Sequence, residues 1–130
     1  MNVLEEKDGL PADSVRSITR GTDGLYYVGT AESLAILSIA DGLNVVETLP
    51  QIQTAISMSA SENGLVAAVT SSGKLFVLNY TDIVFNSEEK GFNEKFTAAV
   101  FSADGRLFAA TESNRIIIFS MVQSRILCDF

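Results

Sequence analysis

Histidine and tryptophan are absent from the 130 residues, and cysteine occurs once, at Cys128. A single cysteine excludes an intrachain disulfide, and without histidine the chain lacks ligands from which zinc sites are usually built. A Ser-His-Asp or Cys-His arrangement would have no base, so these forms of nucleophilic catalysis are excluded. We therefore expect no metal, no cofactor and no enzymatic activity.

Basic residues are also scarce. Nine Lys and Arg stand against sixteen Asp and Glu, which gives a net charge of −7. A chain of this charge, with no Lys/Arg cluster, repels phosphate backbones, so nucleic acid is not an expected partner. No apolar run approaches the roughly 18–20 residues of a membrane span, and the first seven residues lack a signal pattern. Direct membrane insertion of this segment is therefore not expected.

One stretch of the chain recurs three times. Each copy has Asp or Asn, then Gly, then an apolar run, and ends with Thr six positions after the glycine; the copies are 23–30, 63–70 and 104–111. Gly24, Gly64 and Gly105 are therefore 40 and 41 residues apart. Repetition at about 40–45 residues, with several short strands in each unit, is typical of β-propeller blades.

The pattern predicts an all-β chain of about three propeller-type blades, each of four antiparallel strands, with almost no helix. The repeats cover about 9–48, 53–86 and 96–129. The expected strands are 14–18, 25–30, 34–39, 44–48, 53–58, 65–70, 75–78, 82–85, 97–101, 106–111, 115–120 and 124–128. Asp-Gly and Asn-Gly at the recurring turns favour hairpins. Residues 2–6 resemble 44–48, so we expect them to form the closing strand of a preceding or partner blade.

The repeat also predicts structural roles. Val28, Val69 and Ala109 lie in the apolar second strands and should be buried. The recurring threonines, Thr30, Thr70 and Thr111, suggest a repeated hydrogen bond and not a catalytic group.

Candidate binding residues follow from the blade plan. The loop entering strand one and the loop joining strands two and three lie on one face, where propellers commonly bind ligands. Arg16 lies at the start of an innermost strand and could face the central channel. The candidates are Arg16, Glu32, Lys74, Glu112, Asn114 and Arg115. The alternative is that these are solvated turn residues.

The first unit resembles the two-component regulator propeller repeat, which has Trp where Tyr27 stands. The residues that carry the resemblance are Gly9, Leu10, Pro11, Ser14, Val15, Arg16, Ser17, Ile18, Asp23, Gly24, Tyr27, Val28, Gly29, Thr30 and Leu34. The second unit matches less well. The third, 101–111, is also similar to a WD40-type repeat, although it lacks that family's Trp-Asp pair.

The resemblance implies a ligand-sensing propeller segment of a bacterial signalling receptor, in an extracytoplasmic position, with an unknown small molecule or glycan as ligand. The alternative is a WD40-like scaffold that binds proteins. A propeller enzyme acting through carboxylates is the least favoured of the three functions.

Three blades do not close a ring, because propellers usually have four to eight. Each end of the array should then present an apolar blade face, and large exposed apolar faces are rare in soluble monomers. We expect either that the chain is part of a longer propeller or that two copies form a six-bladed ring, with the strand 2–6 beside the partner's last blade.

Overall fold

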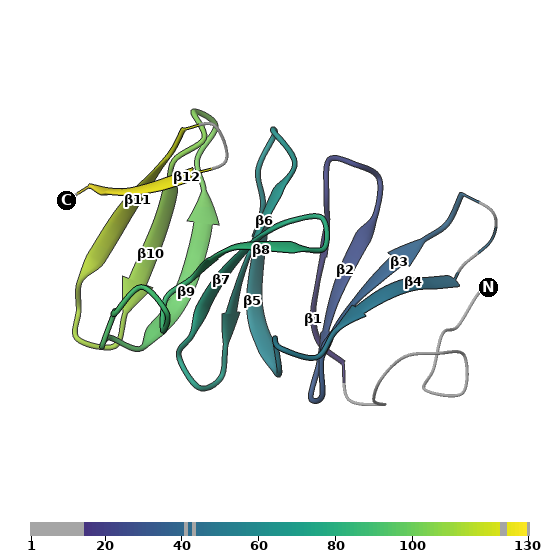
Figure 1. Ribbon diagram of the computed structural model, residues 1–130, viewed down its shortest axis with the longest axis horizontal. Coiled ribbons are helices and arrows are strands. Elements are labelled where there is room, and N and C mark those ends of the chain that lie inside the picture. The colour runs from purple at the N-terminus through teal and green to yellow at the C-terminus, as the bar shows by residue number, and fades with distance from the viewer. Residues whose placement is uncertain (1–14, 41, 43, 123–124, 130) are drawn as a thin grey trace.

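The computed structural model describes residues 15–40, 42, 44–122 and 125–129. Within these ranges the chain forms strands and no helix. The strands are β1 (Val15–Arg20), β2 (Tyr26–Thr30), β3 (Leu34–Ser38), β4 (Asn44–Leu49), β5 (Ala55–Ala60), β6 (Leu65–Thr70), β7 (Leu75–Asn79), β8 (Asp82–Asn86), β9 (Phe96–Phe101), β10 (Leu107–Thr111), β11 (Ile116–Val122) and β12 (Arg125–Asp129). They form three four-stranded antiparallel sheets, each with its strands in chain order (Figure 1). The predicted fold class, three blades of four antiparallel strands, is confirmed. The expected strand 2–6 lies outside the described residues.

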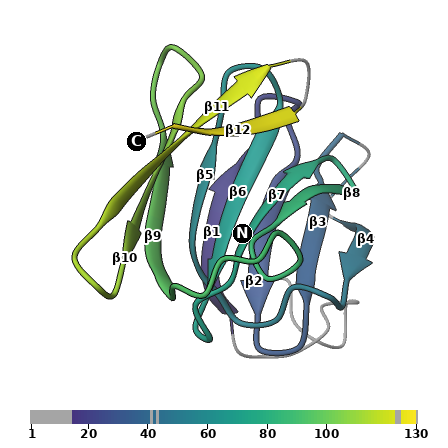
Figure 2. The same cartoon turned by 60° about the vertical axis from the view of Figure 1, so that its left-hand side comes forward.

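The first strands of the three sheets, β1, β5 and β9, lie side by side (Figure 2). The turns β1–β2, β5–β6 and β9–β10 gather at one edge of the array, the upper edge in Figure 1. The loops β2–β3 (31–33), β6–β7 (71–74) and β10–β11 (112–115) gather at the opposite edge. We call the first the hairpin edge and the second the loop edge.

The hairpin turns form as the sequence predicts. Gly24, Gly64 and Gly105 have φ angles of 83°, 92° and 86°, in the left-handed region that glycine adopts without steric cost. Each turn is closed by a backbone hydrogen bond, such as that from Ser61 N to Leu65 O at 2.8 Å. The Asp-Gly and Asn-Gly pairs therefore reverse the chain at the same place in each blade.

Apolar side chains fill the two interfaces between neighbouring blades. Strand β6 of the middle blade contributes to both, because successive side chains of a strand point to opposite faces. Val66 and Ala68 pack toward the first blade, whereas Ala67 and Val69 pack toward the third. All six residues of β6 are buried, and this explains why the strand reads as a continuous apolar run. Val28, Val69 and Ala109 are buried as predicted.

The linker between the second and third blades also contributes to the core. Phe92 stacks edge-on against Phe85 and Phe119, with ring centroids 5.9 and 5.7 Å apart. Ser87 Oγ accepts a hydrogen bond from Leu75 N at 2.9 Å. Residues 88–90 remain exposed. The linker is therefore anchored at both ends of its charged stretch.

The two ends of the array differ. We expected an open apolar face at each end, but in the first blade Val28, Ala35 and Leu37 are buried in a cluster with Tyr26 and Val45. That expectation is wrong for these residues. In the third blade, by contrast, the apolar residues Val100 and Ile116 are exposed.

Candidate functional site

The recurring threonines hold the loop edge in shape. Thr70 Oγ1 accepts a hydrogen bond from Lys74 N at 3.1 Å, and Thr111 Oγ1 accepts one from Arg115 N at 3.2 Å. Thr30 Oγ1 accepts one from Ser33 N at 3.2 Å. All three threonines are buried. The prediction of a repeated structural hydrogen bond is confirmed.

Backbone hydrogen bonds then join these loops to the chain segments that enter the second and third blades. Each of the four is 2.9 Å long: Thr54 N to Thr30 O, Ser71 N to Thr54 O, Phe96 N to Gly73 O, and Glu112 N to Lys95 O. Because the loops are tied to these entering segments, their side chains are displayed from a supported edge.

Five of the six candidate residues lie in these three loops. Glu32 and Glu112 are exposed, and Lys74 Nζ lies 3.4 Å from Glu88 Oε2 in a pair exposed on both sides. Asn114 has a φ of 66°, matching the left-handed Gly73 at the same place in the second blade. The turn requires a left-handed backbone conformation at this position, and asparagine tolerates that conformation. The presence of Asn114 is therefore explained by the turn.

Arg16 lies apart from the loops, in β1. The pairing of β1 with β2 skips this residue, because Val15 faces Thr30 and Ser17 faces Gly29. Similar irregularities recur in the first strands of the other blades, where Ile56 and Thr97 are skipped. All three skipped residues are exposed, and β-bulges often re-aim side chains near binding sites. These bulges have no signature in the sequence.

A hollow of about 310 Å³ opens at the loop edge, between the chain entering β9 and the β10–β11 loop. It is lined by Asn93, Glu94, Lys95, Glu112 and Ser113. Of the candidate residues, Glu112 lines this hollow. Arg115 lies next to it, since its Nη1 atom forms an ion pair with Glu94 Oε1. We call it the loop-edge hollow.

Glu94 is the most unusual side chain of this hollow. Its Oε1 atom binds Arg115, while its Oε2 atom is buried and has no hydrogen-bond partner in the described part of the chain. A buried carboxylate oxygen normally accepts a hydrogen bond, so this atom is an unsatisfied acceptor in a residue that lines the hollow. Sequence reasoning missed residues 93–95. In the sequence, the only features that pointed to these residues were the length and the charge of the preceding linker.

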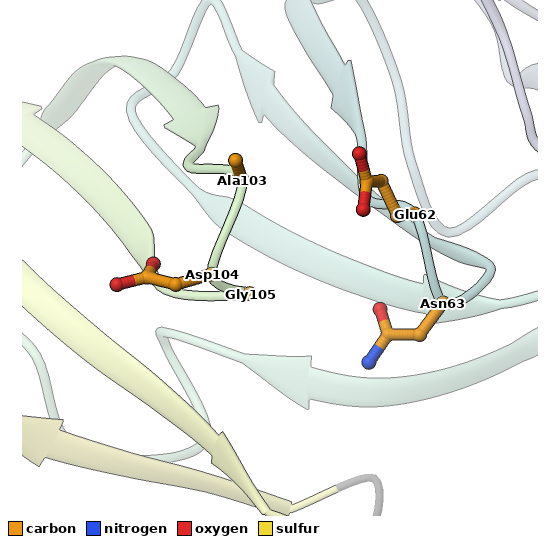
Figure 3. Close-up of a pocket in the computed structure, with 5 residues that line it drawn as sticks. All are labelled: Glu62, Asn63, Ala103, Asp104 and Gly105. Carbon is orange, nitrogen blue, oxygen red and sulfur yellow. The ribbon is translucent and has the colours of Figure 1, made fainter.

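A second hollow, of about 250 Å³, lies at the hairpin edge between two turns. Glu62 and Asn63 line one side, and Ala103, Asp104 and Gly105 line the other (Figure 3). The carboxylate of Asp104 points away from Glu62 and Asn63.

Asp104 is already engaged within its own turn. It accepts hydrogen bonds from the Ser102 hydroxyl and, at 3.0 Å, from Arg106 Nε. The Ser102 hydroxyl and then Arg106 lower the pKa of Asp104 to about 2. Its charge therefore stabilises the turn, and this hollow is the weaker binding candidate.

The described ranges hold neither a grouped set of metal ligands nor a membrane-spanning helix. No three His, Cys, Asp or Glu side chains there are grouped so that they could hold a metal ion. No helix in those ranges meets the length and apolarity that a membrane crossing requires.

Comparison with known proteins defines the fold further. No family model and no curated protein matches the sequence. The chain is similar to the β-propeller domain of Cps50 (Swd1) from Myceliophteria thermophila, with a TM-score of 0.70 and 11% identity over 92% of this chain. It is also similar to a proposed 6-phosphogluconolactonase from Bacteroides uniformis, with a TM-score of 0.64 and 15% identity over 88% of this chain. This chain spans 39% of each of those two chains. At these identities the likeness concerns the fold, which is that of part of a propeller.

Proposed function

We propose that this chain is a non-catalytic propeller segment that binds another protein through its loop edge. The observation that carries the proposal is the loop-edge hollow with the unpartnered Oε2 atom of Glu94. The chain entering β9 is tied to the second blade by the Phe96 N to Gly73 O bond and to the β10–β11 loop by the Glu112 N to Lys95 O bond, so a partner would meet a preformed surface with little ordering to do.

The chemistry of the hollow favours a basic or hydroxyl-bearing side chain of the partner. Glu94 and Glu112 supply carboxylates, the first already paired with Arg115, while Lys95 supplies an ammonium group and Asn93 and Ser113 supply further polar groups. A Lys or Arg placed here would form charge-assisted hydrogen bonds, which are stronger than neutral ones. The acidic balance of the whole chain acts in the same direction, because it attracts basic partners over longer distances.

The test is affinity capture from cells that express the protein, with quantification of the proteins retained. We expect one partner at near-stoichiometric amount, and we expect Glu94→Gln to reduce its retention at least tenfold. A matched control is Asp82→Asn, which removes an exposed carboxylate on β8, outside the hollow. Equal retention by both variants would rule out the hollow as the binding site, provided that their melting curves match the unaltered chain.

Ligand sensing is the second candidate function, as the extracytoplasmic segment of a bacterial signalling receptor. Its support is the resemblance of the first unit to the regulator propeller repeat, together with a hollow large enough for a small polar molecule. A panel of sugars and metabolites tested by thermal shift separates the two functions. A ligand that raises the melting temperature of the unaltered chain, and not that of Glu94→Gln, would replace the scaffold proposal.

A further inference from the structure

Asn63 is the one asparagine of the chain that is followed by a glycine. It is exposed in the β5–β6 turn, and its side chain lines the hollow between the two hairpin turns (Figure 3). The backbone nitrogen of the next residue can attack an asparagine side chain and close a five-membered ring, and an intramolecular attack has a large advantage over attack from solution. Gly64 obstructs this attack least, because it has no Cβ atom.

The turn leaves the nitrogen of Gly64 open. A Cβ atom built on Gly64 would meet no atom within 4 Å outside the adjoining residues, so nothing covers this part of the turn. Gly64 N donates a hydrogen bond to Ser61 O at 3.3 Å, whereas the corresponding bonds in the first and third blades are 3.2 and 3.1 Å long. A hydrogen bond of this length is weak, so the nitrogen is held loosely.

The side-chain carbonyl of Asn63 is polarised by Ser61. Ser61 Oγ donates a hydrogen bond to Asn63 Oδ1 at 2.5 Å and accepts one from Leu65 N at 3.0 Å. The second bond strengthens the first, because linked hydrogen bonds polarise one another. A donor placed on Oδ1 also stabilises the negative charge that develops on this oxygen when a nucleophile adds to Cγ. The carbonyl is therefore prepared for attack.

We propose that Asn63 is a site of spontaneous deamidation. Gly64 N forms a bond to Asn63 Cγ, the bond between Cγ and Nδ2 breaks, and the proton from Gly64 N leaves with Nδ2 as ammonia. Water then opens the succinimide ring. Cleavage of the bond from Cγ to Gly64 N gives aspartate, and cleavage of the bond from the backbone carbonyl carbon of residue 63 to Gly64 N gives isoaspartate. The site lies at the hairpin edge, so this proposal is independent of the loop-edge hollow.

The fold accepts the aspartate product. Asp23 and Asp104 occupy the same place in the other two turns. Asp104 accepts a hydrogen bond from the serine hydroxyl two residues before it, just as Asn63 does. Deamidation to aspartate therefore preserves the turn and places a new carboxylate beside Glu62 in the hollow. Isoaspartate instead adds a methylene group to the backbone, and a hairpin whose register depends on its turn length loses that register.

Peptide mass spectrometry of the full chain, incubated in mildly alkaline buffer, tests the proposal. We expect the peptide with Asn63 to gain one mass unit, in an aspartate and an isoaspartate form, at least tenfold faster than the peptide with Asn86. Asn86 is the internal control, because the nitrogen that follows it, Ser87 N, is buried and donates a hydrogen bond to Leu75 O at 2.9 Å. Asn63→Gln is the matched variant and should stay intact, since its side chain would have to close a larger ring.

The same measurement in guanidinium chloride separates the effect of the turn from that of the sequence. The folded chain should convert at a rate within tenfold of the unfolded chain. A slower conversion than this would overturn the proposal, because the turn would then protect Asn63.

Two variants of Ser61 test the polarised carbonyl. Ser61→Ala should convert at least threefold more slowly than the unaltered chain, whereas Ser61→Thr keeps the hydroxyl and should convert at the normal rate. Circular dichroism confirms that both are folded. Equal rates in all three chains would overturn the activation by Ser61. Asn63→Asp should melt as the unaltered chain does, and a large loss of stability would contradict the accepted product.

Discussion

Gly29 of the first blade lies so close to Ala55 of the second that no side chain fits between them. A Cβ atom on Gly29 would lie 2.6 Å from the carbonyl oxygen of Ala55 and 2.9 Å from its Cβ atom. Ser17 Oγ donates a hydrogen bond to the same carbonyl at 2.5 Å. The spacing of the first two blades is therefore set by direct contact between β2 and the start of β5.

Gly29→Ala should push the first two blades apart. Because the nearest atom is backbone, the strain cannot be relieved by a side-chain rotation, and we expect a loss of about 1–3 kcal/mol in the free energy of unfolding. Urea denaturation measures this loss. Ser71→Ala, in an exposed loop, is the control and should change stability by less than about 0.5 kcal/mol. Equal stability of the two variants would mean that the blades can slide apart freely.

Val28→Asp should be among the most damaging substitutions in the first blade. Val28 is 3% exposed and packs with Ala35 and Leu37, so the carboxylate would be buried without a partner. We expect destabilisation by about 3–5 kcal/mol. Ile56→Asp, at an exposed position of β5, should lower the free energy of unfolding by about 1 kcal/mol, because aspartate has a lower strand propensity than isoleucine and no burial is lost. Near-equal melting temperatures for the two variants would show that the outer side of β2 is not a core face.

Thr70→Val tests the recurring threonine. The change keeps the side-chain shape but removes the acceptor of the Lys74 backbone N–H, and Thr70 is buried. We expect a loss of about 1–3 kcal/mol in the free energy of unfolding. Thr97→Val, at an exposed position of β9, should have little effect. Circular dichroism melts of both variants measure the difference, and a stable Thr70→Val variant would contradict the structural role.

Tyr27 should make folding stability fall at alkaline pH. Burial, and then the hydrogen bond that its hydroxyl donates to Asp23 Oδ2 at 2.9 Å, raise the pKa of Tyr27 well above its usual range. A raised pKa favours the protonated form in the folded state. The contribution of Tyr27 to folding stability is therefore complete below the pKa of about 10 that tyrosine has in the unfolded chain. It is lost as the pH rises above that value toward the higher pKa of Tyr27 in the folded state.

Urea denaturation at about pH 8 and about pH 11 should therefore show a clear loss of stability for the unaltered chain and a smaller one for Tyr27→Phe. The Phe variant has no group to ionise at this position. Identical pH profiles would show that Tyr27 does not control alkaline stability.

The sequence by itself determined the blade plan, because that plan depends on local rules that recur. Gly24, Gly64 and Gly105 mark the hairpins, since a residue type that adopts positive φ freely is required there. The alternation of apolar side chains predicts the strands, and Thr70 with its two counterparts predicts the loop hydrogen bond. Each of these features involves residues within a few positions of one another.

Only the tertiary structure decided which residues meet across blades. Glu94 and Arg115 are 21 residues apart and belong to two different loops, so no local pattern joins them. Val28 and Ile116 are both apolar strand residues, yet one is buried and the other exposed, because burial depends on what packs over a sheet face. The unpartnered oxygen of Glu94 is likewise not predictable from the sequence. Whether a buried polar atom has a hydrogen-bond partner depends on the atoms that surround it in space and not on its neighbours in the chain.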